Sequence, residues 1–247
     1  MLLGVAIGAI YIFILLESTR LQWEIDIMFA KIANSVRWRS KSVQRYICSL
    51  KEKLYDLRMG TDTANQIQVC DLDIENRLKE EAVRYQATKE KNFHCVISKL
   101  PIQYERFAFF DFGSGKGKVL IMAHQCGFRD IYGIEASKYL NVIAKDNIKK
   151  SIKNGHSIKL ICMDASLYHL PPIPSVYYFY NPFKGKILKK VIHNITMALE
   201  NQFSEAYIIY MNSHLAEMFL ETGKFKVFSQ GQIYRQDYCI FTTVRSG

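Results

Sequence analysis

The sequence predicts an α/β domain with a doubly wound, seven-stranded, mostly parallel sheet whose last strand is antiparallel, preceded by a helical N-terminal extension. Three observations support this fold class. From residue 107 onward, short apolar runs alternate with segments of helical periodicity, as in parallel sheets covered by helices. A glycine-rich turn, G-S-G-K-G, follows the first of these runs. Only residues 229–238 separate the last two strands, which is too short a connection for a crossover helix.

The chain is predicted to have three parts: a hydrophobic segment at residues 1–16, a basic helical linker at 17–58 and the α/β domain at 59–247. Residues 2–16 carry no charge, but this run is shorter than the roughly 20 residues that span a bilayer. The basic linker predicts that the rest of the chain stays on the cytoplasmic side. We expect residues 2–16 to anchor the protein to a membrane or to lie on one; a helix buried against the domain or a partner is the alternative.

Composition indicates the compartment and the class of partner. The formal net charge of +10 favours acidic partners such as nucleic acid, anionic lipid or an acidic protein, and a solvated basic face is the alternative. The six cysteines form no C-x-x-C pair, and no histidine stands at metal-ligand spacing to them. This pattern favours reduced thiols in a cytosolic domain over a disulfide framework or a zinc site, so no metal site is expected.

The stretch 107–123 combines a strand, a glycine turn and the start of a helix. Its first part, F-A-F-F-D-F, leaves no polar face, as expected of a parallel strand covered on both sides. Gly113, Gly115 and Gly117 tolerate positive φ and let a ligand approach bare backbone. Together these features predict a site for part of a nucleotide-like ligand, and a tight turn without a ligand is the alternative.

The remaining elements are predicted from the same patterns. Further strands are expected at 131–135, 158–163, 176–180, 206–211, 225–228 and 239–244, and helices at about 116–126, 139–152, 187–199 and 215–220. Upstream of the sheet, residues 60–76 contain polar turn formers. A helical region then extends to about Leu100, includes Tyr85-Gln86-Ala87-Thr88 and ends before Pro101.

Four predicted strands end on a polar residue at the edge where parallel sheets bind ligands: Asp111, Glu135, Asp164 and Asn181. Glu135 is placed to accept hydrogen bonds from both hydroxyls of a ribose, and helix capping is its alternative role. Asp164 is placed to accept an adenine amino group, with Ala165 offering a backbone N–H. A turn aspartate is the alternative for Asp164.

The spacing of the glycines in the turn distinguishes two classes of nucleotide-like ligand. A nicotinamide fingerprint is G-x-G-x-x-G, whereas this turn is D-F-G-S-G-K-G, and a pyrophosphate gains nothing from the Asp111 carboxylate. With this motif, G-I-E, M-D-A, Y-N-P-F and the antiparallel ending, the chain resembles the class I, Rossmann-like S-adenosylmethionine-dependent methyltransferases over about Gly60 to Val244. It is most similar to uncharacterised bacterial methyltransferases with a comparable G-x-D-T, here Gly60–Thr63, and Tyr-x-x-Ser/Thr, here Tyr85–Thr88.

The resemblance implies S-adenosylmethionine as the cofactor and roles for the matching positions. The glycines would bring backbone against the methionine moiety and the ribose, and Asp111 would orient the loop and the amino group. Lys116 would contact the methionine carboxylate, and a solvent-facing position is its alternative. Tyr85 and Thr88 would cover the cofactor, and packing in the core is their alternative. The implied cofactor-binding residues are Asp111, Gly113, Ser114, Gly115, Gly117, Glu135, Asp164, Ala165, Tyr85 and Thr88.

The segment Tyr180-Asn181-Pro182-Phe183 is predicted to supply the catalytic residues, Asn181 and Phe183. It resembles the Asp/Asn-Pro-Pro-aromatic motif of amino-methylating nucleic-acid enzymes without the second proline, and more distantly the non-SET lysine methyltransferases. Asparagine has no useful pKa for a general base, but its carbonyl accepts a hydrogen bond from an amine, and an aromatic ring can face a cation. An amine acceptor is therefore favoured, and a strand-ending turn is the alternative role of the segment.

The sequence thus predicts a methyltransferase that acts on an amine of a protein or a small molecule. One alternative is a nucleic-acid amino-methyltransferase, which is disfavoured because no RNA- or DNA-binding module is recognisable and much of the basic charge lies in the linker. Another is a non-catalytic, cofactor-binding protein associated with a membrane. A nicotinamide oxidoreductase is the least favoured, because of the spacing of the glycines.

Overall fold

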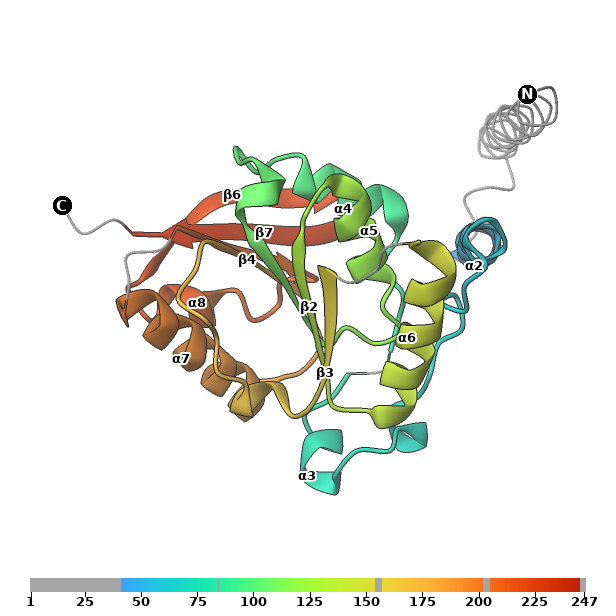
Figure 1. Cartoon of the computed structure of the whole chain (residues 1–247), viewed down its shortest axis with the longest axis horizontal. Coiled ribbons are helices and arrows are strands. Elements are labelled where there is room, and N and C mark those ends of the chain that lie inside the picture. The colour runs from blue at the N-terminus through green and yellow to red at the C-terminus, as the bar shows by residue number, and fades with distance from the viewer. Residues whose placement is uncertain (1–40, 84, 154–156, 202–204, 245–247) are drawn as a thin grey trace, which may run out of the picture. The chain divides into compact units, whose positions relative to one another are not determined.

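The computed structural model describes residues 41–83, 85–153, 157–201 and 205–244 (Figure 1). The chain divides into two compact units, Met1–Lys51 and Glu52–Gly247. The predicted hydrophobic segment and linker residues 17–40 lie outside the described residues, and helix α2 (Lys41–Met59) covers the rest of the predicted linker. Within the described ranges, no helix combines the length and the hydropathy needed to cross a membrane.

The folded unit is built on a seven-stranded sheet with the order β3-β2-β1-β4-β5-β7-β6. The strands are β1 (Ala108–Phe112), β2 (Asp130–Glu135), β3 (Ile158–Cys162), β4 (Ser175–Tyr180), β5 (Ala206–Met211), β6 (Phe225–Ile233) and β7 (Gln236–Thr243). β1 to β5 pair in parallel, whereas β7 is antiparallel to both of its neighbours. The predicted fold class and the antiparallel last strand are confirmed.

Different helices cover the two faces of the sheet (Figure 1). The upstream segment contributes α3 (Asn76–Lys79); α4 (Glu90–Ile97), α5 (Lys118–Cys126) and α6 (Lys138–Ser151) pack on one face, and α7 (Gly185–Asn201) and α8 (Glu217–Leu220) pack on the other. Successive side chains of a strand point to opposite faces. Phe109 therefore joins the core beneath α4 and α5, while Phe110 and Phe112 join the core beneath α7. All five residues of β1 are buried, which explains the apolar run.

The final hairpin is longer than predicted. β6 and β7 extend through most of residues 229–238 and leave Tyr234 and Arg235 as a two-residue turn. The φ angles of these two residues are 48° and 65°, as in hairpin turns whose twist matches that of the strands. Most side chains of β6 are exposed, so its second half, S-Q-G-Q, lacks the apolar pattern by which a strand is recognised in a sequence.

The segment before α4 departs from the predicted helix. α4 begins only at Glu90, and Tyr85 lies in an isolated β-bridge with Ile67. The Val83 N–H donates to the Pro182 carbonyl at 3.1 Å, and the Tyr85 N–H donates to the Ile67 carbonyl at 3.0 Å. The helix predicted through Tyr85 is wrong, because bonds to distant segments hold this backbone extended.

Candidate functional site

A cavity lies at the carboxyl ends of β1, β2 and β4. β1 lies between β2 and β4 in the sheet, so the connection after β1 leads to one side of it and the connection after β3 crosses to the other side. Doubly wound sheets bind ligands where the strand order reverses in this way. The cavity is lined by every predicted site residue except Gly115 and Gly117: Asp111, Gly113, Ser114, Glu135, Asp164, Ala165, Tyr85, Thr88, Asn181 and Phe183. The upstream segment adds an apolar wall that includes Leu72, Ile74 and Leu78.

The glycine turn needs glycine for two reasons, its backbone angles and its close neighbours. The φ angles of Gly113, Gly115 and Gly117 are 79°, 53° and 79°, all in the left-handed region that favours glycine. A Cβ on Gly115 would lie 2.3 Å from the Tyr85 ring, and a Cβ on Gly113 would lie 2.5 Å from the Pro182 side chain. The turn is therefore packed directly against both the upstream segment and the segment that follows β4.

Backbone hydrogen bonds tie the first part of the turn to β2. The Gly113 and Ser114 N–H groups both donate to the Ile134 carbonyl, at 2.8 and 3.2 Å. The Ser114 hydroxyl is buried without a hydrogen-bond partner in the described part of the chain, and it lies where a Cβ on Gly133 would be 2.8 Å away. The turn is thus fixed in the sheet before any ligand is bound.

Two carboxyl groups stand close together at the cavity. Glu135 accepts the Gly115 N–H at 3.0 Å on one oxygen and the Ser137 N–H at 2.9 Å on the other. Burial raises the pKa of Glu135, although these N–H bonds oppose the shift. Asp111 is almost fully buried, and burial together with the charge of Glu135 raises its pKa well above the ordinary value. A ligand with positive charge would relieve both effects.

We expect this pair to make the ligand-free protein less stable as the pH rises. The folded-state pKa values of Asp111 and Glu135 lie above their ordinary values of 3.8 and 4.5, so the stability they contribute is fully present below those values. That stability is lost as the pH rises through the raised pKa values. Asp111→Asn cannot ionise, so its melting temperature should gain on that of the parent protein with increasing pH. A difference in melting temperature, Asp111→Asn minus parent, that falls between pH 4 and pH 8 would contradict the assignment.

Asp164 lies at the cavity but is already engaged by protein groups. One of its oxygens accepts the Ser166 N–H at 2.8 Å at the start of a short 3-10 helix, Ala165–Leu167, and the other pairs with Arg77 at 2.9 Å. The capping bond is the turn role that the sequence offered as the alternative, and the adenine contact stays a prediction. Arg77 was missed, because no spacing rule connects it to a residue so far along the chain.

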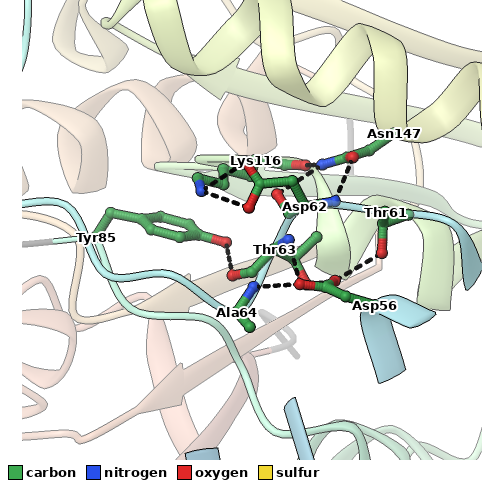
Figure 2. Close-up of polar contacts among 8 residues, drawn as sticks. All are labelled: Asp56, Thr61, Asp62, Thr63, Ala64, Tyr85, Lys116 and Asn147. Carbon is green, nitrogen blue, oxygen red and sulfur yellow. Dashed lines mark hydrogen bonds and ion pairs between the residues drawn. The ribbon is translucent and has the colours of Figure 1, made fainter. Parts of the chain in front are cut away.

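The upstream segment is held over the glycine turn by a polar network (Figure 2). The Tyr85 hydroxyl donates to the Thr63 carbonyl at 3.0 Å. Asp56, near the end of α2, accepts hydrogen bonds from the Thr61 and Thr63 hydroxyls and from the backbone N–H groups of Thr63 and Ala64, all between 2.7 and 2.8 Å. The G-x-D-T segment singled out in the sequence is therefore a turn that positions Tyr85 against Gly115.

The same network fixes the position of Lys116. Its ammonium pairs with both oxygens of Asp62, at 3.1 and 3.2 Å, and lies 5.7 Å from the centre of the Tyr85 ring. Asn147 accepts the Asp62 N–H at 2.9 Å and donates to the Asp62 and Lys116 carbonyls. Lys116 is almost fully buried, so the predicted solvent-facing role does not fit its position. It is absent from the cavity wall, and its contact with a methionine carboxylate stays a prediction.

The segment after β4 brings the predicted catalytic residues to the cavity. Asn181 adopts a φ of 47°, a left-handed conformation that asparagine tolerates better than most residues. Its side-chain oxygen accepts a hydrogen bond from the Tyr210 hydroxyl at 3.4 Å, and burial raises the pKa of Tyr210 to about 12, so this hydroxyl stays a donor. Phe183 is buried and forms an isolated β-bridge with Ala82 of the upstream segment.

The sheet order, with an antiparallel β7, is a fold that the chain shares with solved structures of methyltransferases. Neither a protein-family model nor a curated protein sequence matches the chain. Among solved structures, it is similar to precorrin-6y C5,15-methyltransferase from Geobacter metallireducens GS-15, with a TM-score of 0.52 and 20% identity over 72% of this chain and 97% of that one. It is also similar to the glycopeptide N-methyltransferase MtfA complexed with S-adenosylmethionine, with a TM-score of 0.51 and 9% identity over 65% of this chain and 95% of that one.

Proposed function

We propose that the protein is an S-adenosylmethionine-dependent methyltransferase that acts on an amine of a protein or a small molecule. The observation that carries the proposal is a pair of carboxyl groups, the almost fully buried Asp111 and the part-buried Glu135, at a cavity beside the glycine turn. S-adenosylmethionine carries a sulfonium and an ammonium, whereas a dinucleotide carries a negative pyrophosphate. A cavity with this charge therefore favours the cationic ligand.

The other groups at the cavity fit the parts of this cofactor. Each Glu135 oxygen accepts one backbone N–H and keeps a lone pair for a ribose hydroxyl. Asp164 and Ala165 lie on the cavity wall with the apolar side chains of Leu72 and Leu78, a mixture that suits the edge and the faces of adenine. We infer that these residues hold the nucleoside part.

The acceptor side is proposed to consist of Asn181 and Phe183. Bound S-adenosylmethionine supplies a methyl group on a good leaving group, so the chain's main task is to align the acceptor and exclude water. The Asn181 carbonyl can accept a hydrogen bond from an amine and so direct its lone pair, while the Tyr210 hydroxyl restrains the same oxygen. Alignment of this kind contributes about 7 kcal/mol or more in intramolecular reactions.

The neighbours' names show that this fold serves different acceptor atoms. MtfA is a glycopeptide N-methyltransferase, whereas the precorrin enzyme is a C5,15-methyltransferase. The proposal of an amine therefore depends on Asn181 and Phe183 and not on the fold. Transfer of a labelled methyl group from S-adenosylmethionine into a cell extract tests it. Label in protein or small amines is expected, and label in nucleic acid would select the alternative acceptor instead.

Cofactor binding has its own test in Glu135→Gln. Loss of the charge and of one acceptor oxygen is expected to weaken S-adenosylmethionine binding by about 30-fold or more, because hydrogen bonds to charged groups contribute roughly 1.5–3 kcal/mol each. Isothermal titration calorimetry measures this effect. Glu105→Gln, an exposed position outside the cavity wall, is the matched control and should bind like the parent protein. Equal affinities of the parent protein and Glu135→Gln would refute the ribose assignment.

A further inference from the structure

A second lysine, Lys118, comes directly after the glycine turn and, unlike Lys116, lines the cavity. It is the first residue of α5 and follows Gly117, the left-handed residue before the helix. Its side chain is 2% exposed, and among the described residues that line the cavity it is the single basic one. An ammonium buried at a ligand cavity needs partners, because an isolated charge is costly to remove from water.

The partners of Lys118 come from the end of α2. Its ammonium forms an ion pair with Glu52 and lies 4.0 Å from the centre of the Tyr55 ring. Burial raises the pKa of Glu52, and the charge of Lys118 opposes this shift. The Tyr55 hydroxyl is buried and has no hydrogen-bond partner among the described residues, so the cluster also holds an unused donor.

Residues of opposite charge line the cavity on the two sides of the glycine turn in the sequence. Asp111 and Lys118 both line the cavity; a carboxyl group suits a ligand ammonium, and a lysine ammonium suits a ligand carboxylate. An amino acid carries both groups on one carbon. The N-terminal end of α5 adds the positive end of a helix dipole at Lys118, which favours the same negative group. Lys116 is not a lining residue of the cavity, and both oxygens of Asp62 hold its ammonium.

We propose that Lys118 binds the carboxylate of the amino-acid end of S-adenosylmethionine, and that Glu52 and Tyr55 position its ammonium for this contact. The inference rests on the proposed function and names the part of the cofactor that the lysine recognises. An ammonium has three donors, so Lys118 can keep its bond to Glu52 while it donates to a ligand carboxylate. The pair thus lowers the cost of burying the lysine before the ligand arrives.

The test compares two ligands that differ only in this carboxylate: S-adenosylmethionine and decarboxylated S-adenosylmethionine. Lys118→Met is expected to weaken binding of S-adenosylmethionine by about 10- to 100-fold, the range for a charge-assisted hydrogen bond, and to change binding of the decarboxylated ligand by less than about threefold. Titration calorimetry measures both affinities. Lys116→Met is the matched control, and it should change both affinities by the same factor.

Removal of Lys118 alone leaves Glu52 buried without its partner, which can unfold the protein. The double variant Glu52→Gln/Lys118→Met removes both charges and keeps the side chains close to their original size, and it should show the same selective loss. An equal loss for both ligands in either folded variant would overturn the assignment and leave Lys118 a structural residue. If the parent protein bound neither ligand, the proposed function itself would be wrong.

Discussion

Gly115→Ala is expected to weaken S-adenosylmethionine binding by more than about 100-fold. A Cβ at this position would lie 2.3 Å from the Tyr85 ring, and the φ of 53° is unfavourable for alanine. The tyrosine cannot move freely, because its hydroxyl is bonded to Thr63. A shift of the turn would also displace the Gly115 N–H from Glu135, and misplacement of about 1 Å can cost 100-fold in function. The free energy of unfolding should fall by about 2–5 kcal/mol from overpacking and backbone strain together.

Gly223→Ala separates these two causes. Gly223 has a similar φ of 67°, but a Cβ there would meet no atom within 4 Å. The change should cost only the backbone strain, about 1–2 kcal/mol, and leave cofactor affinity unchanged. Chemical unfolding and calorimetric titration of both variants provide the comparison. Similar losses of binding in the two variants would show that the contact between Gly115 and Tyr85 has no role in the site.

Asn181→Gly is expected to slow methyl transfer by about 100- to 1,000-fold while S-adenosylmethionine affinity stays within about threefold, if the carbonyl aligns the acceptor as proposed. Glycine is the informative replacement because it keeps the left-handed backbone, φ 47°, and removes only the amide. Asn181→Ala removes the amide and adds strain, so it should be slower and less stable. Single-turnover rates with a saturating acceptor measure the effect.

Asn212→Gly is the matched control for this experiment. Asn212 also adopts a left-handed conformation, φ 54°, but it is absent from the cavity wall and its oxygen accepts a hydrogen bond from Gln236. Loss of that bond should lower stability by about 1 kcal/mol and leave the rate within about threefold. A large fall in the rate for Asn212→Gly, or none for Asn181→Gly, would remove Asn181 from the proposed alignment.

Local patterns were enough to predict the sheet and the edge of the sheet at which the cavity lies. The alternation of strands and helices, the short connection before the last strand and the apolar β1 run each depend on neighbours in the sequence, and all are confirmed. Positive φ at the three glycines follows from the same local chemistry. The weakest parts were segments without periodicity: the polar edge strand β6 and the extended backbone around Tyr85, whose hydrogen bonds go to distant partners.

Sequence alone thus predicted the edge of the sheet at which the cavity lies, because strand ends and glycine turns are recognised at short range. The tertiary structure decided which side chains meet there. Asp56 reaches Thr63, Asp62 takes Lys116, Arg77 takes Asp164, and Glu52 leaves Lys118 at the cavity. The last three pairs join segments far apart in the chain, and no spacing rule encodes them. In each pair folding removes at least one charge from water, and a charge in that position needs a partner. The partners found in the fold place Lys118 at the cavity and Lys116 away from it.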